Sequence, residues 1–110
     1  MIARTPKPPY YAVIFTSVRN TATEGENIAY DAMACHMDEL AKLQPGYLGM
    51  ESAKNDMGIT ISYWKTLEDI VHWKQHSEHI IAQQMGIKNW YLSYTTRICL
   101  VERDYSFHKL

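Results

Sequence analysis

Along the chain, segments in which hydrophobic residues recur at every second position alternate with segments in which they recur at every third or fourth position. This pattern predicts elements in the order strand, helix, strand, strand, helix, strand. Residues 10–18 (YYAVIFTSV) are apolar on both alternating faces, which is typical of a central strand. Residues 47–53 and 59–64 predict two more strands, and the turn residues at 55–58 favour a hairpin between them. Residues 95–103 predict the last strand.

The first helix is predicted over residues 28–43, after a polar loop in which Asn27 is placed to cap it. Its apolar residues recur at steps of three and four: Ala29, Met33, Met37, Leu40 and Leu43. His36 lies within this stripe. The pattern therefore predicts either a core histidine or one that points into a helix–sheet cavity and acts as a base.

The second helix is predicted to be long, because Thr66 and Asp69 resemble a capping box at its start and the first breaker is Gly86. Leu67, Ile70 and Ile81 are expected to point towards the core. Residues 88–94 (KNWYLSY) predict a short aromatic-rich helix or a bend before the last strand.

Three histidines share one face of this second helix, because His72, His76 and His79 follow each other at steps of four and three. Two histidines at such spacing can bind a divalent metal ion. No third-ligand cysteine pattern accompanies them, so the sequence favours an exposed or interface face and predicts no metal site.

These elements predict one α+β domain at residues 10–107, after an extended proline-rich arm at 1–9 and before a tail at 108–110. The order predicts a ferredoxin-like βαββαβ fold, with one antiparallel sheet and both helices on one face. Six residues of the predicted strands cannot all lie under the helices: Tyr11, Phe15, Tyr63, Trp64, Cys99 and Val101. We therefore expect a homodimer in which two sheets pack face to face.

Composition narrows the class of protein. The formal net charge is −1 and no basic run is interleaved with aromatic residues, which argues against nucleic-acid binding. The apolar runs are shorter than the roughly 20 residues of a membrane helix, and the N-terminus resembles no secretory signal. Cys35 and Cys99 are expected to be buried free thiols in the cytoplasm; a disulfide is the alternative.

Nearly the whole chain resembles the antibiotic biosynthesis monooxygenase family. The resemblance lies in YYAVIFTSVR, QPGYLGMESA, GITISYWKTLEDIVHWK, EHIIAQQMG and NWYLSYTTRICLVERDYSF. It implies the dimeric α+β barrel fold, with a cavity between sheet and helices in each protomer. It also implies that O₂ attacks a small aromatic or quinol compound there without a metal ion or flavin, so we expect no cofactor.

The resemblance and the residue patterns together suggest a site. The candidate catalytic residues are His36, Trp73 and His79. The residues expected to contact a substrate are Phe15, Ser17, Trp64, His76, Trp90, Tyr94 and Arg97. Ordinary packing is the alternative for the tryptophans, and an ion pair at the surface or dimer interface is the alternative for Arg97.

The sequence is compatible with two other functions. One is a non-enzymatic dimer that binds or sequesters a small molecule. The other is a haem-degrading monooxygenase, since Trp73 matches the tryptophan of that branch of the family. Its haem-binding histidine would stand ten residues later, where this chain has Gln83.

Overall fold

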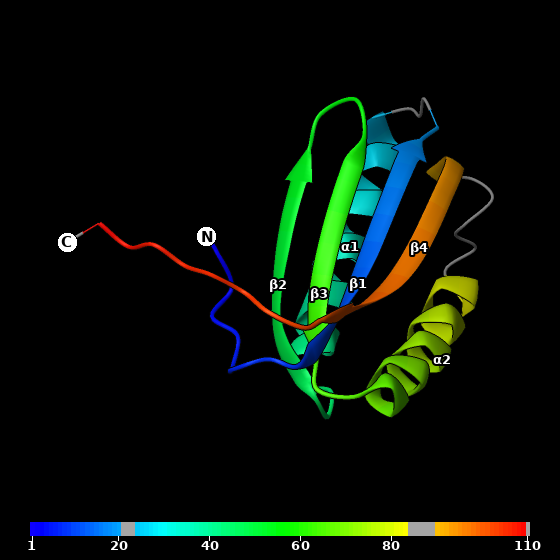
Figure 1. Cartoon of the computed structure of the whole chain (residues 1–110). Coiled ribbons are helices and arrows are strands. Elements are labelled where there is room, and N and C mark those ends of the chain that lie inside the picture. Colours follow the sequence, from blue (N-terminus) through cyan, green and yellow to red (C-terminus); the bar gives the residue numbers. More distant parts are fainter. Residues whose placement is uncertain (21–23, 84–89, 110) are drawn as a thin grey trace.

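One four-stranded antiparallel sheet with two helices on one side makes up the fold (Figure 1). The computed structural model describes residues 1–20, 24–83 and 90–109, with the backbone alone at 24–27 and 80–83. The elements are β1 (Tyr10–Arg19), α1 (Glu24–Lys42), β2 (Tyr47–Lys54), β3 (Gly58–Trp64), α2 (Leu67–Gln83) and β4 (Tyr91–Val101). The predicted α+β, ferredoxin-like element order is confirmed, and the strands lie in the order β2-β3-β1-β4.

The strand register separates the two faces of the sheet. Val13 of β1 pairs with Ser62 of β3 and Ile98 of β4, and side chains at paired positions share a face. All three residues border a cavity together with residues of both helices, so this face is the helix-covered one. The next residue, Ala12, pairs with Tyr63 and Cys99 on the other face, which we call the open face.

The core lies where β3 meets the start of α2. Trp64 is fully buried, and its indole N–H donates a 2.8 Å hydrogen bond to the hydroxyl oxygen of Ser62. Ile70 on α2 and Ala41 on α1 are also buried. Leu67 is 49% exposed, so the expectation that it points into the core is wrong. The side chain of Ile81 lies outside the described residues.

The capping role predicted for Thr66 at the start of α2 is confirmed, but the Asp69 carboxylate bonds to the Thr66 hydroxyl and not to its backbone N–H, as a full capping box would require. The backbone N–H of Asp69 donates to the Thr66 hydroxyl over 3.1 Å, and that hydroxyl donates to the Asp69 carboxylate over 2.8 Å. The Asp69 side chain also lies against Gly46, which has φ 82° and whose carbonyl accepts from the N–H of Lys65. The turn before β2 and the start of α2 are therefore in direct contact.

Two element boundaries differ from the sequence prediction. Helix α1 begins at Glu24, so the prediction that Asn27 caps it is wrong. Strand β4 begins at Tyr91, so the bend predicted over 88–94 is wrong from that residue onward; residues 88 and 89 lie outside the described part. A bulge at Leu92 of β4, opposite Val18 and Arg19, lets the aromatic segment continue the ladder with β1. The break predicted near Gly86 also lies outside the described residues.

The arm and the tail leave the sheet at one corner. The hydroxyl of Tyr10 accepts from the Thr5 hydroxyl over 2.9 Å and donates to the Asp104 carboxylate over 2.6 Å. Beyond Asp104 the chain runs out past the β2 edge of the sheet, with the rings of Tyr105 and Phe107 exposed (Figure 1). The arm is also attached to the open face, because the N–H of Ala3 donates to a carboxylate oxygen of β2.

Both cysteines are free, as predicted, but they are not buried. Cys35 is exposed on α1, and Cys99 is exposed on the open face of the edge strand β4. The burial prediction is wrong for Cys35, which lies on the exposed face of α1, and Cys99 is exposed in the single chain. In this single chain, nothing described covers the open face of β4.

Candidate functional site

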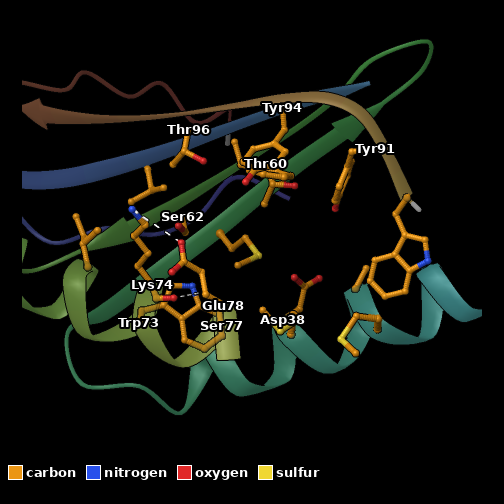
Figure 2. Close-up of a pocket in the computed structure, with 18 of the residues that line it drawn as sticks. Asp38, Thr60, Ser62, Trp73, Lys74, Ser77, Glu78, Tyr91, Tyr94 and Thr96 are labelled. Atoms are coloured by element: carbon orange, nitrogen blue, oxygen red, sulfur yellow. Dashed lines mark hydrogen bonds and ion pairs between the residues drawn. The ribbon is translucent and has the colours of Figure 1, made fainter. Parts of the chain in front are cut away.

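A cavity of about 470 Å³ lies between the helix-covered face of the sheet and the two helices (Figure 2). Its walls are mostly apolar and aromatic. The sheet contributes Val13, Phe15, Met50, Thr60, Ser62, Thr96 and Ile98; α1 contributes Tyr30, Met33, Ala34, Met37 and Asp38; α2 contributes Ile70, Trp73, Lys74, Ser77 and Glu78. Trp90, Tyr91 and Tyr94 complete the lining. The volume is that of a site for a small organic molecule.

An aromatic cluster forms one end of the cavity. The Tyr91 ring lies edge-on to the rings of Phe15 and Tyr30, with centroids 5.7 Å apart in each pair. Its hydroxyl donates to the Tyr30 hydroxyl over 3.1 Å. Burial and this hydrogen bond raise the pKa of Tyr91, which therefore remains a neutral donor. The Arg19 guanidinium lies 3.6 Å from the Tyr30 ring centroid and completes the cluster from outside.

Trp73 forms the wall at the other end. Its ring stacks on that of the buried Trp64, which fixes its place against the sheet. The His76 ring contacts Trp73 from the exposed side of α2, at a centroid distance of 5.9 Å. An aromatic ligand inside the cavity would thus lie between Trp73 and the cluster around Tyr91.

Three charged side chains border this apolar space. Asp38 points from α1 towards the space under the sheet (Figure 2). The Asp38 side chain is exposed on its outer side, but its partial burial against the cavity raises the pKa of its carboxyl above the ordinary aspartate value, and the nearby Lys42 offsets part of this effect. On α2, the Lys74 ammonium lies 3.9 Å from the Glu78 carboxylate. Both side chains are more than half exposed, so this pair lies at the rim of the cavity and contributes little to stability.

Four of the residues expected at the site line the cavity: Phe15, Trp73, Trp90 and Tyr94. Three others do not. Ser17 and Trp64 are buried within the fold and are not among the lining residues, and Arg97 lies on the open face, where it pairs in register with Ile14. The expected substrate contacts of these three residues are therefore not supported by their placement.

The histidines lie away from the cavity. His36 is exposed, so its expected burial in the apolar stripe of α1 is wrong. The face of α1 that meets the sheet includes Met37, Asp38 and Ala41, and is therefore rotated by roughly one residue from that stripe. On α2, His76 and His79 are exposed, as is His72. This is the exposed face that the sequence favoured.

No histidine borders the cavity in the part of the chain that the structure describes, which includes all five. The histidine ligand of haem-degrading proteins thus has no counterpart among the described lining residues. The side chain of Gln83, at the position of that ligand, lies outside the described residues. Within the same ranges, no group of three or more histidine, cysteine or acidic residues is arranged to hold a metal ion. No described helix is long and apolar enough to cross a membrane.

Sequence reasoning missed the three charged lining residues. The apolar stripe of α1 predicts that the neighbouring helix face meets the sheet, and Asp38 lies outside that stripe. Lys74 and Glu78 had a usable signal, because they follow Ile70 at successive steps of four, on the side of the helix that also carries Trp73. A polar residue on the side of a helix that faces the sheet indicates either a polar partner in the core or a cavity beside the helix.

No protein-family model matches the chain. It is 43% identical over 110 residues to the uncharacterized protein YqjZ of Bacillus subtilis (strain 168), a match that covers 98% of this chain and 93% of YqjZ.

Solved structures with the same fold share little sequence with the chain. SnoaB of Streptomyces nogalater, described as a cofactor-independent oxygenase, superposes with a TM-score of 0.64 at 8% identity, over 93% of this chain and 100% of SnoaB. A Nitrosomonas europaea protein, provisionally named an antibiotic biosynthesis monooxygenase, superposes with a TM-score of 0.63 at 14% identity. The match covers 89% of this chain and 94% of that protein. A dimeric ferredoxin-like protein from an uncultured marine organism superposes with a TM-score of 0.62 at 14% identity, over 89% of this chain and 100% of that protein. The resemblance to antibiotic biosynthesis monooxygenases is confirmed for the fold.

Proposed function

We propose, from the premise that this chain belongs to the same protein family as YqjZ of Bacillus subtilis, that it is a cofactor-independent monooxygenase acting on a small phenolic or quinol-type compound. The observation that carries the proposal is the position of Asp38, a carboxyl with a raised pKa beside an apolar, aromatic-lined cavity of about 470 Å³. The fold shared with SnoaB, described as a cofactor-independent oxygenase, supports the reaction type.

The reaction needs no external reductant. A phenol and O₂ together contain the atoms of a quinone and one water molecule, and the substrate supplies all four electrons that O₂ accepts. Asp38 takes the phenolic proton, which makes the ring electron-rich enough to react with O₂. A carboxylate with a raised pKa is a stronger base than an ordinary aspartate, so the surroundings of Asp38 favour this step.

The developing negative charge needs donors near the ring. The hydroxyl groups of Thr60 and Thr96 border the cavity from the sheet, and the Lys74 ammonium borders it from α2 (Figure 2). Donors held on strands and helices stabilise an oxyanion without having to reorganise. Trp73 and Tyr91 hold the aromatic ring of the substrate between them and limit the access of water to it.

Oxygen uptake tests the proposal. The purified protein is mixed with a panel of hydroquinones, naphthols and anthrone-like phenols, and O₂ consumption is measured with products identified by mass spectrometry. We expect turnover of at least one compound and a loss of about 10²-fold or more in Asp38→Asn. Glu39→Gln, a neighbour on the same helix that does not line the cavity, is the matched control and keeps full activity. No O₂ uptake across the panel overturns the proposal.

A non-enzymatic small-molecule-binding dimer is the second candidate function. Its support is that, among the described lining residues, Asp38 has no histidine beside it to complete an acid–base pair. Ligand binding without O₂ consumption, unchanged in Asp38→Asn, would favour it.

The proposal includes a homodimer and a cytoplasmic location. The neighbour described as a dimeric ferredoxin-like protein supports the first. The second suits Cys35 and Cys99, because exposed thiols remain reduced in the cytoplasm.

A further inference from the structure

Ser62 is the most deeply buried of the hydroxyl-bearing residues in the described cavity wall. It is 7% exposed and lies on β3, on the sheet side of the cavity (Figure 2). Thr60, on the same strand, is half-buried, and Thr96 on β4 is exposed. A buried polar group lowers stability unless it has a hydrogen-bond partner, so the partners of Ser62 indicate what the residue does.

Only the acceptor side of the Ser62 hydroxyl is used within the chain. The indole N–H of the fully buried Trp64 donates to the Ser62 oxygen over 2.8 Å. A hydroxyl group donates one hydrogen bond besides those it accepts, and within the described part of the chain the Ser62 proton has no acceptor. The proton turns away from the incoming N–H, and a ligand in the cavity can supply the missing acceptor.

The other donors that border the cavity from the sheet and α2 are less well placed. Within the described residues, no hydrogen bond orients the hydroxyl of Thr60 or Thr96. The Lys74 side chain is 68% exposed, so water competes for its ammonium group. A buried donor that is already oriented loses less freedom and less hydration when it binds a ligand. Ser62 is such a donor.

We propose that Ser62 donates its hydroxyl proton in a hydrogen bond to a keto or quinone oxygen of the aromatic ligand, and that the Trp64 N–H is the group that positions it. This inference rests on the cavity being the ligand site of the proposed function, and it deepens that proposal by naming an acceptor. The Trp73 ring stacks on that of Trp64, so a ligand ring packed against Trp73 brings a substituent oxygen towards Ser62.

Asp38 and Ser62 then recognise different oxygens of the ligand. An ionised carboxylate only accepts hydrogen bonds, so Asp38 interacts with a hydroxyl group of the ligand, whereas the Ser62 proton needs an acceptor. We therefore expect the tightest binding from aromatic compounds that carry both a hydroxyl and a keto oxygen. A ligand without the keto oxygen leaves the Ser62 proton unpaired inside the cavity, which lowers the affinity.

Binding of two matched probes tests the assignment. 1-Tetralone and tetralin differ only in a carbonyl group, and neither has a hydroxyl group for Asp38. Equilibrium dialysis gives their dissociation constants without turnover. We expect Ser62→Ala to weaken the binding of 1-tetralone by about fivefold and to change that of tetralin by less than about twofold. The unchanged tetralin affinity also shows that the cavity of the variant is intact.

Two further variants separate the hydroxyl group from general damage. Ser62→Thr retains a donor at this position and should bind 1-tetralone within about threefold of the wild type. Ser52→Ala removes a hydroxyl from the neighbouring strand at the position paired with Thr60, outside the cavity lining, and is the matched control that leaves both affinities unchanged.

Infrared spectroscopy of bound 1-tetralone tests the positioning by Trp64. A hydrogen bond lowers the stretching frequency of a carbonyl group, so we expect one lowered band in the wild type and an unshifted band in Ser62→Ala. Trp64→Phe retains a ring but loses the N–H. The Ser62 hydroxyl then takes several orientations, and we expect the band to broaden or split. A loss of packing alone would leave the band as it is in the wild type.

Four outcomes overturn the inference. Binding of neither probe to the wild type also removes the small-molecule site on which the proposed function depends, whereas the other outcomes leave that site in place. Equal losses for both probes in Ser62→Ala show that Ser62 only supports the packing of Trp64. A carbonyl band that remains lowered in Ser62→Ala shows that another donor contacts the ketone. An unchanged band in Trp64→Phe removes the positioning role. O₂ uptake is scored separately and decides only the catalytic proposal.

Discussion

The indole rings of Trp64 and Trp73 stack across the junction of β3 and α2, with centroids 6.1 Å apart and planes inclined by 24°. Trp64 is fully buried, whereas Trp73 is half-buried and forms part of the cavity wall. One aromatic pair thus attaches the second helix to the sheet and shapes the site.

Trp73→Ala is expected to weaken both roles of this pair. The loss of ring packing should lower the free energy of unfolding by about 2 kcal/mol, less than for a fully buried tryptophan. Urea unfolding measures this change. Trp73→Phe retains a ring against Trp64 and should lose less than half as much; equal losses in the two variants would contradict the stacking explanation.

The capping box at the start of α2 gives a second prediction. Thr66→Ala removes the acceptor for the N–H of Asp69 and should cost about 1 kcal/mol of unfolding free energy. Thr66→Ser retains the hydroxyl and should remain within a few tenths of a kcal/mol of the wild type. Chemical denaturation of both variants decides the point, and identical midpoints for alanine and serine would show that the cap contributes nothing.

The stability of Asp38→Asn should depend on pH. The folded protein raises the pKa of this carboxyl, so the folded state retains the proton more readily than the unfolded chain does. Its contribution is greatest below about pH 4 and is lost as the pH rises through the raised value. Asp38→Asn removes this loss. The variant should therefore gain stability over the wild type between pH 4 and pH 7, while losing the proposed activity.

Unfolding by urea at several pH values measures the difference between the two proteins. Asp31→Asn, on the same helix but outside the cavity lining, serves for comparison. If the free energies of unfolding of Asp38→Asn and the wild type differed by the same amount at every pH, partial burial would not raise the pKa of Asp38, and this explanation would be wrong.

Thiol labelling gives a prediction about the interface. Cys35 is exposed on α1, and Cys99 is exposed on the open face that a second copy is proposed to cover. In the single-cysteine variants Cys35→Ser and Cys99→Ser, maleimide should react slowly with Cys99 and rapidly with Cys35 at concentrations where the dimer forms.

Dilution to concentrations at which the dimer dissociates should accelerate the labelling of Cys99 and leave that of Cys35 unchanged. Rapid labelling of Cys99 in an intact wild-type dimer would mean that the dimer uses another surface.

The sequence predicted the fold well because its signals were local. The strand at β1, the hairpin at β2 and β3, and the capping box of Thr66 and Asp69 each follow from spacing or turn chemistry within a few residues. The start of β4 was missed because Tyr91 joins the sheet through a bulge opposite Val18 and Arg19, a non-local pairing.

The site was predicted less well because its lining depends on how α1 is rotated about its own axis. The apolar stripe of α1 suggested that His36 faces the sheet, whereas the helix turns Asp38 towards the cavity. A rotation of roughly one residue exchanges one candidate base for another, and hydrophobic spacing alone does not resolve it. Trp73 was identified because its position within the resembling segment did not depend on that rotation.

The contact between Gly46 and Asp69 has an evolutionary consequence. Gly46 adopts a left-handed conformation, and the space that a side chain would take there is occupied by the Asp69 carboxylate. Neither position can change without regard to the other. A larger residue at 46 would displace the cap of α2, and a smaller one at 69 would leave the turn without its neighbour. Natural relatives that retain this cap should therefore retain the glycine, so the two positions should be inherited as a pair.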